Sequence, residues 1–293
     1  MNIKGLLHPT NRTKRLLVGL FLGVLFCIQC TQDTVANKPN IGNSVVVKQG
    51  QVIAAGSPDV SPTVEKLART DHVALLKLCQ DNYQKHYSNY TCTFIKQETI
   101  RGRLGKEQTT TVKFMEKPFS VVMTWTANRP SPADRVIFVD GGNWPGKVLC
   151  RPAGILKAIG TQVREPWGDD AKAQSLKPIT EFGIANMTKN LLDVYEVARK
   201  AGDGTEEFGG YFDLNGRRCV LLVRHLKPNP AQNYPAKKAE IYVDVEYLVP
   251  VCVKGWDWND QFSCIYGYKD IKFNMPLTEN DFLPQSNEMQ PPR

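Results

Sequence analysis

Apolar side chains recur every three or four residues in two stretches of this chain, and each stretch predicts a helix. The first covers residues 71–85, where an apolar stripe is interrupted only by isolated charges. The second follows Pro178, where Thr180 is expected to cap a helix whose apolar positions extend from residue 184 to residue 198. Glycine at 202 and 204 then ends this second helix.

Most of the remaining sequence has strand character, with many Val, Ile, Thr and aromatic residues. Residues 119–126 alternate most clearly, because the odd-numbered positions are all apolar and the even-numbered ones are mostly polar. We expect the odd-numbered face to line the core or a cavity, with Trp125 near the end of the strand. The predicted strands are residues 90–98, 109–116, 119–126, 135–139, 147–150, 217–226, 238–245, 249–256 and 262–273.

This order of elements predicts an α+β fold. About eight or nine antiparallel strands form a curved sheet, with one helix before the sheet and one in the middle of it covering one face. Polar loops at residues 101–106 and 140–143 connect neighbouring strands as hairpins.

A long segment without clear periodicity, residues 151–177, interrupts the strands and carries several apolar side chains. Loops of this length inside a domain are commonly functional. The segment either covers the open mouth of the sheet as the gate of an apolar cavity, or packs as a plain cover on the core. The candidate cavity lining from this segment and from the strand at 119–126 is Phe119, Val121, Met123, Trp125, Ile155, Leu156 and Ile159.

The N-terminal segment has the layout of an export signal, because four basic residues precede an uncharged apolar run at residues 16–28. A membrane-spanning helix needs roughly 20 apolar residues, and this run is shorter. Thr34-Val35-Ala36 offers a cleavage site, whereas Cys27 or Cys30 would allow lipid attachment, although neither follows the expected small residues. We therefore expect a periplasmic or cell-envelope protein, with membrane attachment through this segment as an alternative.

The pattern divides the chain into four parts. Residues 1–36 form the signal segment, and residues 37–65, rich in Pro and Gly, form a flexible tether. Residues 66–284 form a single α+β domain. Residues 285–293 contain few side chains able to pack and are expected to form a disordered tail.

Charge argues against a nucleic-acid partner. Removing the four basic residues and Asp33 of the signal segment leaves 33 basic and 28 acidic residues, which is a net charge of +5 rather than +8. No cluster of five or more Lys and Arg occurs in the remainder, so a solvated surface of mixed charge is expected.

Six cysteines lie outside the signal segment, namely Cys79, Cys92, Cys150, Cys219, Cys252 and Cys264. An even number in an exported chain is compatible with disulfides, but most of these residues lie in apolar strand-like runs where a free cysteine packs as a small apolar residue. Both readings stay open. No Cys/His spacing typical of zinc occurs, and no metal site is predicted.

Motifs of the common catalytic classes are absent from the sequence, including nucleophile elbows, zinc-protease motifs and phosphate or dinucleotide loops. We predict no catalytic residue and no cofactor. The carboxylate pairs Asp169-Asp170 and Glu206-Glu207 keep a hydrolase open as an alternative, provided that they converge in space.

Three phrases resemble an uncharacterised bacterial secreted family known as domain of unknown function fifteen-seventy-one. They are residues 90–98 (YTCTFIKQE), residues 117–121 (KPFSV) leading to Trp125, and residues 177–183 (KPITEFG) before the second helix. The resemblance spans most of residues 71–283. This family has no established activity, so the resemblance implies a domain and not a function.

The layout is more distantly similar to the periplasmic lipoprotein carriers of the LolA and LolB type. The similarity includes the closing pattern at residues 268–274 followed by Leu277 and Phe282. It implies a strongly curved antiparallel sheet, or half-barrel, with helices covering one face and a hydrophobic cavity that in those carriers holds acyl chains.

The leading hypothesis is a noncatalytic cell-envelope protein whose cavity takes an acyl chain, such as that of a lipid or a lipoprotein. A second hypothesis is an envelope sensor or regulator that binds a peptide or a membrane-protein partner. The hydrolase is the third.

Overall fold

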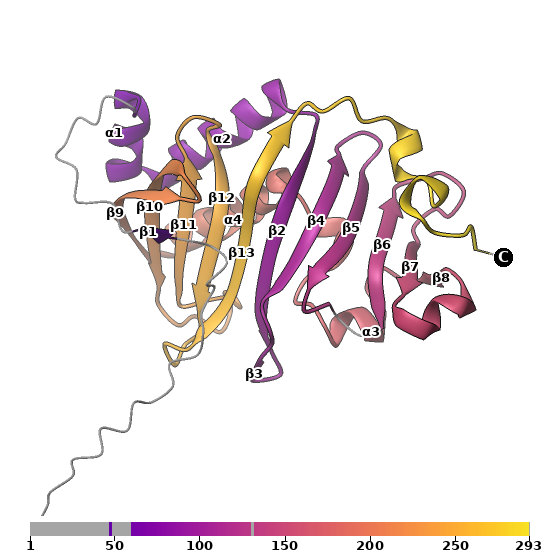
Figure 1. Cartoon of the computed structure of the whole chain (residues 1–293). Helices are drawn as coiled ribbons and strands as arrows, with labels where there is room; N and C mark the ends of the chain where they lie inside the picture. The colour runs from indigo at the N-terminus through magenta and orange to yellow at the C-terminus, as the bar shows by residue number, and fades with distance from the viewer. Residues whose placement is uncertain (1–46, 49–59, 130–131, 293) are drawn as a thin grey trace, which may run out of the picture. The chain divides into compact units, whose positions relative to one another are not determined.

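Strand pairing organises the protein into one antiparallel sheet (Figure 1). The computed structural model describes residues 47–48, 60–129 and 132–292, all within the unit Asn40–Arg293. The signal segment and most of the tether lie outside the described residues. The sheet order is β1-β9-β10-β11-β12-β13-β2-β4-β5-β6-β7-β8, and β3 pairs with β2 beside this path. Its strands are β1 (Val47–Lys48), β2 (Asn89–Ile100), β3 (Arg103–Leu104), β4 (Gln108–Met115), β5 (Ser120–Ala127), β6 (Ala133–Val139), β7 (Val148–Pro152), β8 (Gln162–Arg164), β9 (Gly204–Leu214), β10 (Arg217–Leu226), β11 (Lys238–Asp244), β12 (Val249–Trp256) and β13 (Phe262–Phe273).

The α+β class with a curved antiparallel sheet is confirmed, and the strands are more numerous than expected. The principal addition is β9, whose glycines and acidic residues concealed it in the sequence. Gly209 is required there, because a Cβ atom at this position would lie 2.6 Å from Cγ of Leu221 on β10. The register between the two strands shifts next to this contact, between Leu221 and Leu222. The bulge therefore occurs where the backbone of β9 lies closest to a β10 side chain.

The principal helices are α1 (Pro62–Thr70), α2 (His72–His86) and α4 (Ile184–Ala201), and α3 (Asp169–Lys172) is a single turn. Asp71 caps α2 through its side chain, which accepts a hydrogen bond of 3.0 Å from the backbone N–H of Ala74. The expected cap Thr180 instead lies in the 3₁₀ turn η2 (Ile179–Glu181). The α4 helix begins after Gly183, whose φ of 114° favours glycine and whose Cβ would meet the Phe114 ring at 2.9 Å.

The expected tether boundary at residue 65 is wrong, because α1 already begins at Pro62 and buries Val64. Proline suits the first helical position because it lacks a backbone N–H group, and an N–H at that position would have no acceptor within the helix. β1 is a second departure, since Val47 and Lys48 pair with β9.

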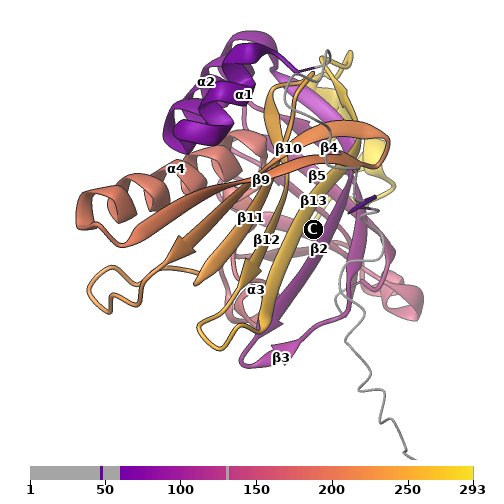
Figure 2. The ribbon, with the colours of Figure 1, turned by 90° about the vertical axis from the view of Figure 1, so that its left-hand side faces the viewer.

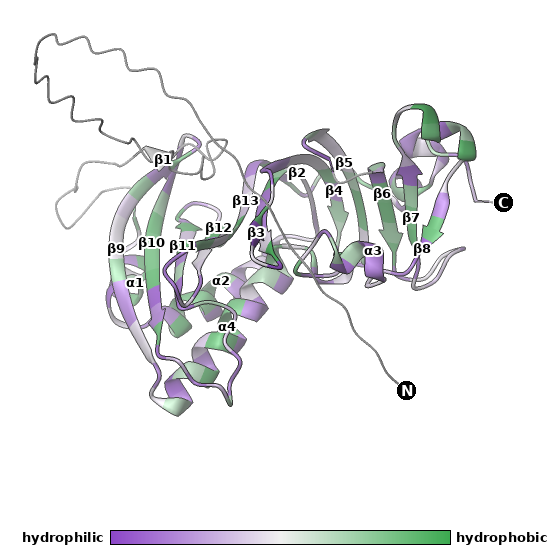
Figure 3. Ribbon diagram, turned by 90° about the horizontal axis from the view of Figure 1, so that it is seen from below, coloured by the Kyte–Doolittle hydropathy of each residue, from purple (hydrophilic) through white to green (hydrophobic). Residues whose placement is uncertain are grey.

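The sheet bends around its helices. Figures 2 and 3 show α2 and α4 lying along one face of β9–β13, which we call the inner face. The α2 helix packs on α4 and β12, and α4 also packs on β9. Leucines and isoleucines of this layer are buried, among them Leu75, Leu76, Leu192, Leu222 and Ile241. Burial of this apolar layer stabilises the fold at roughly 25 cal/mol per Å².

The C-terminal residues pack on the opposite face of β4–β7, which we call the outer face. The 3₁₀ turns η3 (Glu279–Phe282) and η4 (Gln285–Asn287) place Phe282 and Met289 against Val122 and Ile137. The disordered tail predicted for residues 285–293 is therefore wrong for its first residues, since Asn287 and Met289 are buried. The packing of this segment could not be predicted from the sequence, because it depends on a few apolar residues that are separated along the chain.

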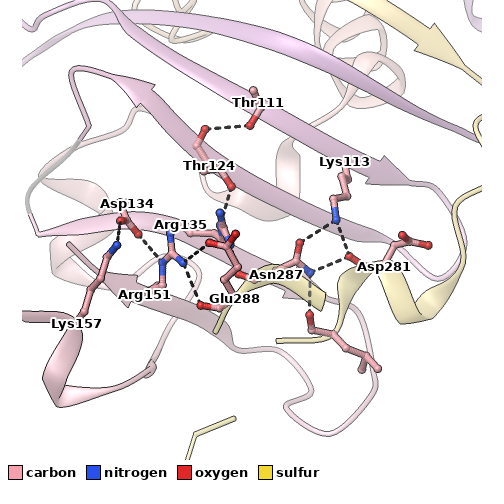
Figure 4. A network of polar contacts seen from close by, with 11 residues as sticks. Thr111, Lys113, Thr124, Asp134, Arg135, Arg151, Lys157, Asp281, Asn287 and Glu288 are labelled. Carbon is pink, nitrogen blue, oxygen red and sulfur yellow. Dashed lines mark hydrogen bonds and ion pairs between the residues drawn. The ribbon is translucent and has the colours of Figure 1, made fainter. Parts of the chain in front are cut away.

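Polar contacts hold the same segment to the outer face (Figure 4). The side chain of Asn287 accepts a hydrogen bond of 3.0 Å from Lys113 Nζ and donates to the carbonyls of Asp281 and Leu283. Arg151 lies 3.1 Å from the carboxylate of Glu288 and 2.8 Å from that of Asp134. The C-terminal segment is thus an integral layer of the fold.

Candidate functional site

A cavity of about 1000 Å³ opens between the inner face of the sheet and the segment that leads from β8 to α4. Its walls come from the central and later strands of the sheet and from residues 187–194 of α4. Apolar side chains form most of these walls: Phe94, Met123, Trp125, Val136, Val148, Phe182, Met187, Leu191, Val253 and Tyr268. The cavity lies at the upper end of the size range of small-molecule sites, roughly 300–1000 Å³.

Alternation along the strands supplies this wall. Phe94 on β2, Met123 on β5 and Val136 on β6 share the inner face, so their side chains point to the same space. Across the cavity, α4 contributes Met187 and Leu191 from successive turns.

Residues 162–183, which we call the covering segment, close one side of the cavity. The segment comprises β8, α3 and η2, and many of its residues line the cavity. Of the segment predicted as a cover, residues 151–177, the first part therefore contributes Pro152 and the second part the remaining lining residues. The covering segment begins where β8 pairs with β7, which turns the chain back toward the cavity.

Buried polar contacts fasten the covering segment to β2. The carboxylate of Glu98, almost fully buried, accepts hydrogen bonds from Tyr266 Oη at 2.6 Å and from the Leu176 backbone N–H at 3.3 Å. Lys96 Nζ lies 3.0 Å from the same carboxylate and donates to the carbonyl of Gln174 at 3.3 Å. Burial raises the pKa of Tyr266 well above its ordinary value, so its phenol stays protonated and donates to Glu98.

Two cysteines on the wall behave as apolar groups. Burial raises the pKa of Cys150 to about 11 and that of Cys264 to about 12. Both thiols therefore stay neutral at neutral pH. All six cysteines of the described domain are free. The alternative of small buried residues agrees with the structure for most of them.

Arg224 is the exceptional residue of the wall. It lies on β10 with 3% of its surface exposed, and it lines the cavity. Its guanidinium carbon is 4.7 Å from the centre of the Tyr195 ring on α4, a cation–π contact. Within the described residues, its Nε and Nη1 atoms have no hydrogen-bond acceptor. Burial lowers the pKa of Arg224.

Of the seven predicted lining residues, the structure brings Met123 and Trp125 to the cavity. Phe119 and Val121 belong to the adjoining core, where Val121 is fully buried. Ile155, Leu156 and Ile159 are instead exposed, with Ile155 93% accessible. They lie on the 3₁₀ turn η1 (Gly154–Ile159), which precedes β8 and has no buried residue. Loop sequence alone could not fix the direction of these side chains.

The four carboxylates considered for hydrolysis lie in different elements. Asp169 and Asp170 begin α3, and Asp170 lies 3.6 Å from Arg164. Glu206 and Glu207 lie on β9, where Glu206 pairs with Arg199 at 2.8 Å and Glu207 is 3.9 Å from His225. Glu206 therefore joins β9 to α4 through Arg199 and to α2 through the backbone N–H of His72.

Sequence reasoning missed Arg224 and Glu98, although each left a signal. Arg224 follows five consecutive apolar residues, 219–223, in a strand expected to be buried. Glu98 has the same strand parity as Phe94, which places both on the inner face. A charged residue at such a position requires a partner or a ligand.

Across residues 60–129 and 132–292, no group of three or more His, Cys, Asp or Glu side chains is arranged to hold a metal ion. None of the helices in these residues is long and apolar enough to span a bilayer.

Comparison with known families gives one match to a family model. The model described as "Protein of unknown function (DUF1571)" matches residues 87–290. This is the family expected from the three sequence phrases. The search of curated proteins found no match.

Solved structures give distant likenesses. MucB is 12% identical over 72% of this chain and 62% of its own, with a TM-score of 0.44, so the chain spans less than two thirds of MucB. The lipoprotein LppX of Mycobacterium tuberculosis is 12% identical over 71% of this chain and 99% of its own, with a TM-score of 0.41. A LolA superfamily protein of Nitrosomonas europaea is 7% identical over 72% and 98%, with a TM-score of 0.33. These likenesses concern the arrangement of the chain and assign no activity.

Proposed function

The chain belongs to the DUF1571 family, whose description assigns no activity, and from its cavity we propose that it is a noncatalytic binding protein for an acyl chain or a similar lipid-like ligand. The observation that carries this proposal is the cavity of about 1000 Å³ with mostly apolar walls. An apolar chain placed there would leave water, which contributes about 0.8 kcal/mol for each buried methylene group.

The construction of the walls supports a flexible, elongated ligand. Phe94 and Trp125 provide flat aromatic surfaces, and methionines at 123 and 187 adapt their shape to an irregular chain. The neutral thiols of Cys150 and Cys264 continue the apolar surface. Such a lining favours burial of hydrocarbon over recognition of a polar substrate.

The proposed location is the cell envelope. This part of the proposal rests on the basic residues and the apolar run at the N-terminus, which lie outside the described residues. An acyl-chain binding protein suits that compartment, because hydrocarbon chains need a protein to shield them from water between membranes.

The test is to express the full-length coding sequence, purify the protein, and analyse it by native mass spectrometry and by organic extraction. We expect a bound hydrophobic molecule that extraction removes, followed by uptake of hexadecanoic acid by the emptied protein. A protein that repeatedly carries no ligand and takes up no hexadecanoic acid would contradict the proposal.

A matched pair of variants connects binding to the cavity. Met123→Asp places a charge on the apolar wall, and we expect it to reduce uptake at least tenfold. Val197→Asp places the same charge on an apolar side chain of α4 that is 39% exposed and lies outside the cavity lining, and uptake should be unaffected. Equal uptake by the two variants would place the binding surface elsewhere.

A further inference from the structure

Two guanidinium nitrogens of Arg224 without a hydrogen-bond acceptor bear on the kind of ligand that the cavity takes, and this inference rests on the function proposed above. A buried charge without partners is costly, so buried cations are normally paired or hydrogen-bonded. Arg224 is 3% exposed, and among the described residues Nε and Nη1 meet no acceptor. The guanidinium cannot escape this cost by deprotonation, because an arginine side chain keeps its charge in proteins.

Two acidic residues, one beside Arg224 in the sheet and one on the cavity wall, are engaged with other residues. Glu206, its register partner on β9, pairs with Arg199 at 2.8 Å and accepts the backbone N–H of His72 at 3.0 Å. Asp193 of α4, which also lines the cavity, lies 2.6 Å from Lys189. Tyr195 offers the face of its ring. Stacking on this ring compensates part of the charge and none of the hydrogen bonds.

The position of Arg224 directs it to the cavity. Its strand neighbour on β11 is Ala239, and both line the cavity together with Leu191 and Val194 of α4. Apolar residues therefore share this part of the cavity wall with the cation. An acyl chain lying along this wall can bring a terminal anionic group to the guanidinium.

We propose that Arg224 binds the anionic head group of the ligand, and that this ligand is a long-chain carboxylic acid. A carboxylate carries one negative charge, which matches one arginine, and its oxygens accept guanidinium hydrogen bonds. A phosphate head group, with up to two charges, would require a second unengaged cation. Three of the other cations on the lining are paired with carboxylates, Lys96 with Glu98, Lys177 with Glu181 and Arg164 with Asp170. The fourth, Lys254, follows the inner-face residue Val253, so its side chain lies on the opposite face, where its ammonium is 5.4 Å from the centre of the Tyr242 ring. The lining thus favours a single negative charge.

The experiment compares hexadecanoic acid, its methyl ester and hexadecyl phosphate by calorimetric titration of delipidated full-chain protein at pH 8. Charge-assisted hydrogen bonds in a desolvated site predict that the acid binds roughly ten- to a hundredfold tighter than the ester. Arg224→Met should remove this preference and leave affinity for the ester unchanged. Lys177→Met, which changes an exposed cation at the cavity, should keep it.

A second measurement does not depend on the folding of any variant. Hexadecanoic acid labelled with carbon-13 at its carboxyl group is titrated while bound to the native protein. The pKa of the carboxyl group should be lower in the protein than for the same acid in micelles of an uncharged detergent, because a nearby cation favours the ionised form. Arg224→Lys keeps the charge and should retain part of the shift.

The outcomes separate this inference from the proposed function. Equal affinity for acid and ester, a preference that persists in Arg224→Met, or an unshifted carboxyl pKa overturns the role of Arg224 and leaves an acyl-binding cavity. Tighter binding of hexadecyl phosphate than of the acid overturns the choice of a carboxylate. Failure of all three probes to bind overturns the proposed function itself.

Discussion

The hydroxyl of Tyr195 lies 3.0 Å from Nδ1 of His72, while the ring of the same tyrosine stacks against the guanidinium of Arg224. The other ring nitrogen of His72, Nε2, is 3.0 Å from the carbonyl of Ala68. A carbonyl only accepts, so Nε2 carries the proton and Nδ1 accepts from the tyrosine. The neutral His72 side chain therefore holds the Tyr195 ring in place against the guanidinium of Arg224.

This arrangement predicts that stability depends on His72 at mildly acidic pH. Burial lowers the pKa of His72 below its ordinary value of 6.5, although Glu206 at 3.9 Å acts in the opposite direction. The unfolded state then binds the proton first, so the free energy of unfolding is highest above pH 6.5 and decreases as pH falls through 6.5. Denaturant titrations between pH 8 and about pH 5 should show this decrease, and His72→Gln should flatten it.

Glu206 acts at lower pH. Burial alone would raise its pKa, but hydrogen bonds from Arg199 and the His72 backbone hold it below 4.5. Its contribution is present above pH 4.5 and is lost below it. A loss of stability confined to this lower range would contradict the role of His72.

The strands were predictable wherever one face had to be apolar. The boundaries of β10, β12 and β13 agree with the predicted residues at both ends, because alternation and flanking turns define them. β9 was not predicted, because it contains Gly209, where only a glycine avoids a clash with the Leu221 side chain on β10. The sequence of β9 alone does not show this contact with another strand.

The candidate site was partly predictable for the same reason. Alternation identified Met123 and Trp125, since their face follows from the pleat of β5. The side chain of Ile155 lies on a 3₁₀ turn, where no period determines direction. The partner of Glu98 is Tyr266, which is 168 residues distant. Such a pair is defined only by the folded sheet.

Trp125→Ala should weaken ligand binding more than it reduces stability. Trp125 is half-buried on the cavity wall, and its Nε1 donates to Gln108 Oε1 at 2.8 Å. The free energy of unfolding should therefore decrease by less than the about 3–5 kcal/mol typical of a fully buried tryptophan. Denaturation and hexadecanoic acid titration measure the two effects. Val121→Ala is the matched control in the core, where we expect a loss of about 2 kcal/mol with near-normal binding. The reverse pattern would place Trp125 in the core.

The C-terminal segment should contribute strongly to stability. Phe282 is 2% exposed and packs on the outer face with Val122 and Leu149. Phe282→Ala should reduce the free energy of unfolding by about 3–5 kcal/mol. Leu283→Ala, at a neighbouring residue that is 40% exposed, should cost less than about 0.5 kcal/mol. Similar midpoints for the two variants in urea would show that the segment does not pack as described.

The contact between Tyr266 and Glu98 should hold the covering segment closed. Tyr266→Phe removes the hydrogen bond of 2.6 Å to the buried carboxylate, and bonds to charged groups contribute about 1.5–3 kcal/mol. Without this bond the Glu98 carboxylate is held less firmly, and it is also the acceptor for the backbone N–H of Leu176. The Leu176 amide should therefore exchange with solvent deuterium roughly tenfold faster or more. Tyr87→Phe removes a hydroxyl that donates to Tyr247 instead, and it should leave the Leu176 amide unchanged. Exchange at Leu176 that is equal in both variants and the native protein would mean that the covering segment is held by its apolar contacts rather than by Glu98.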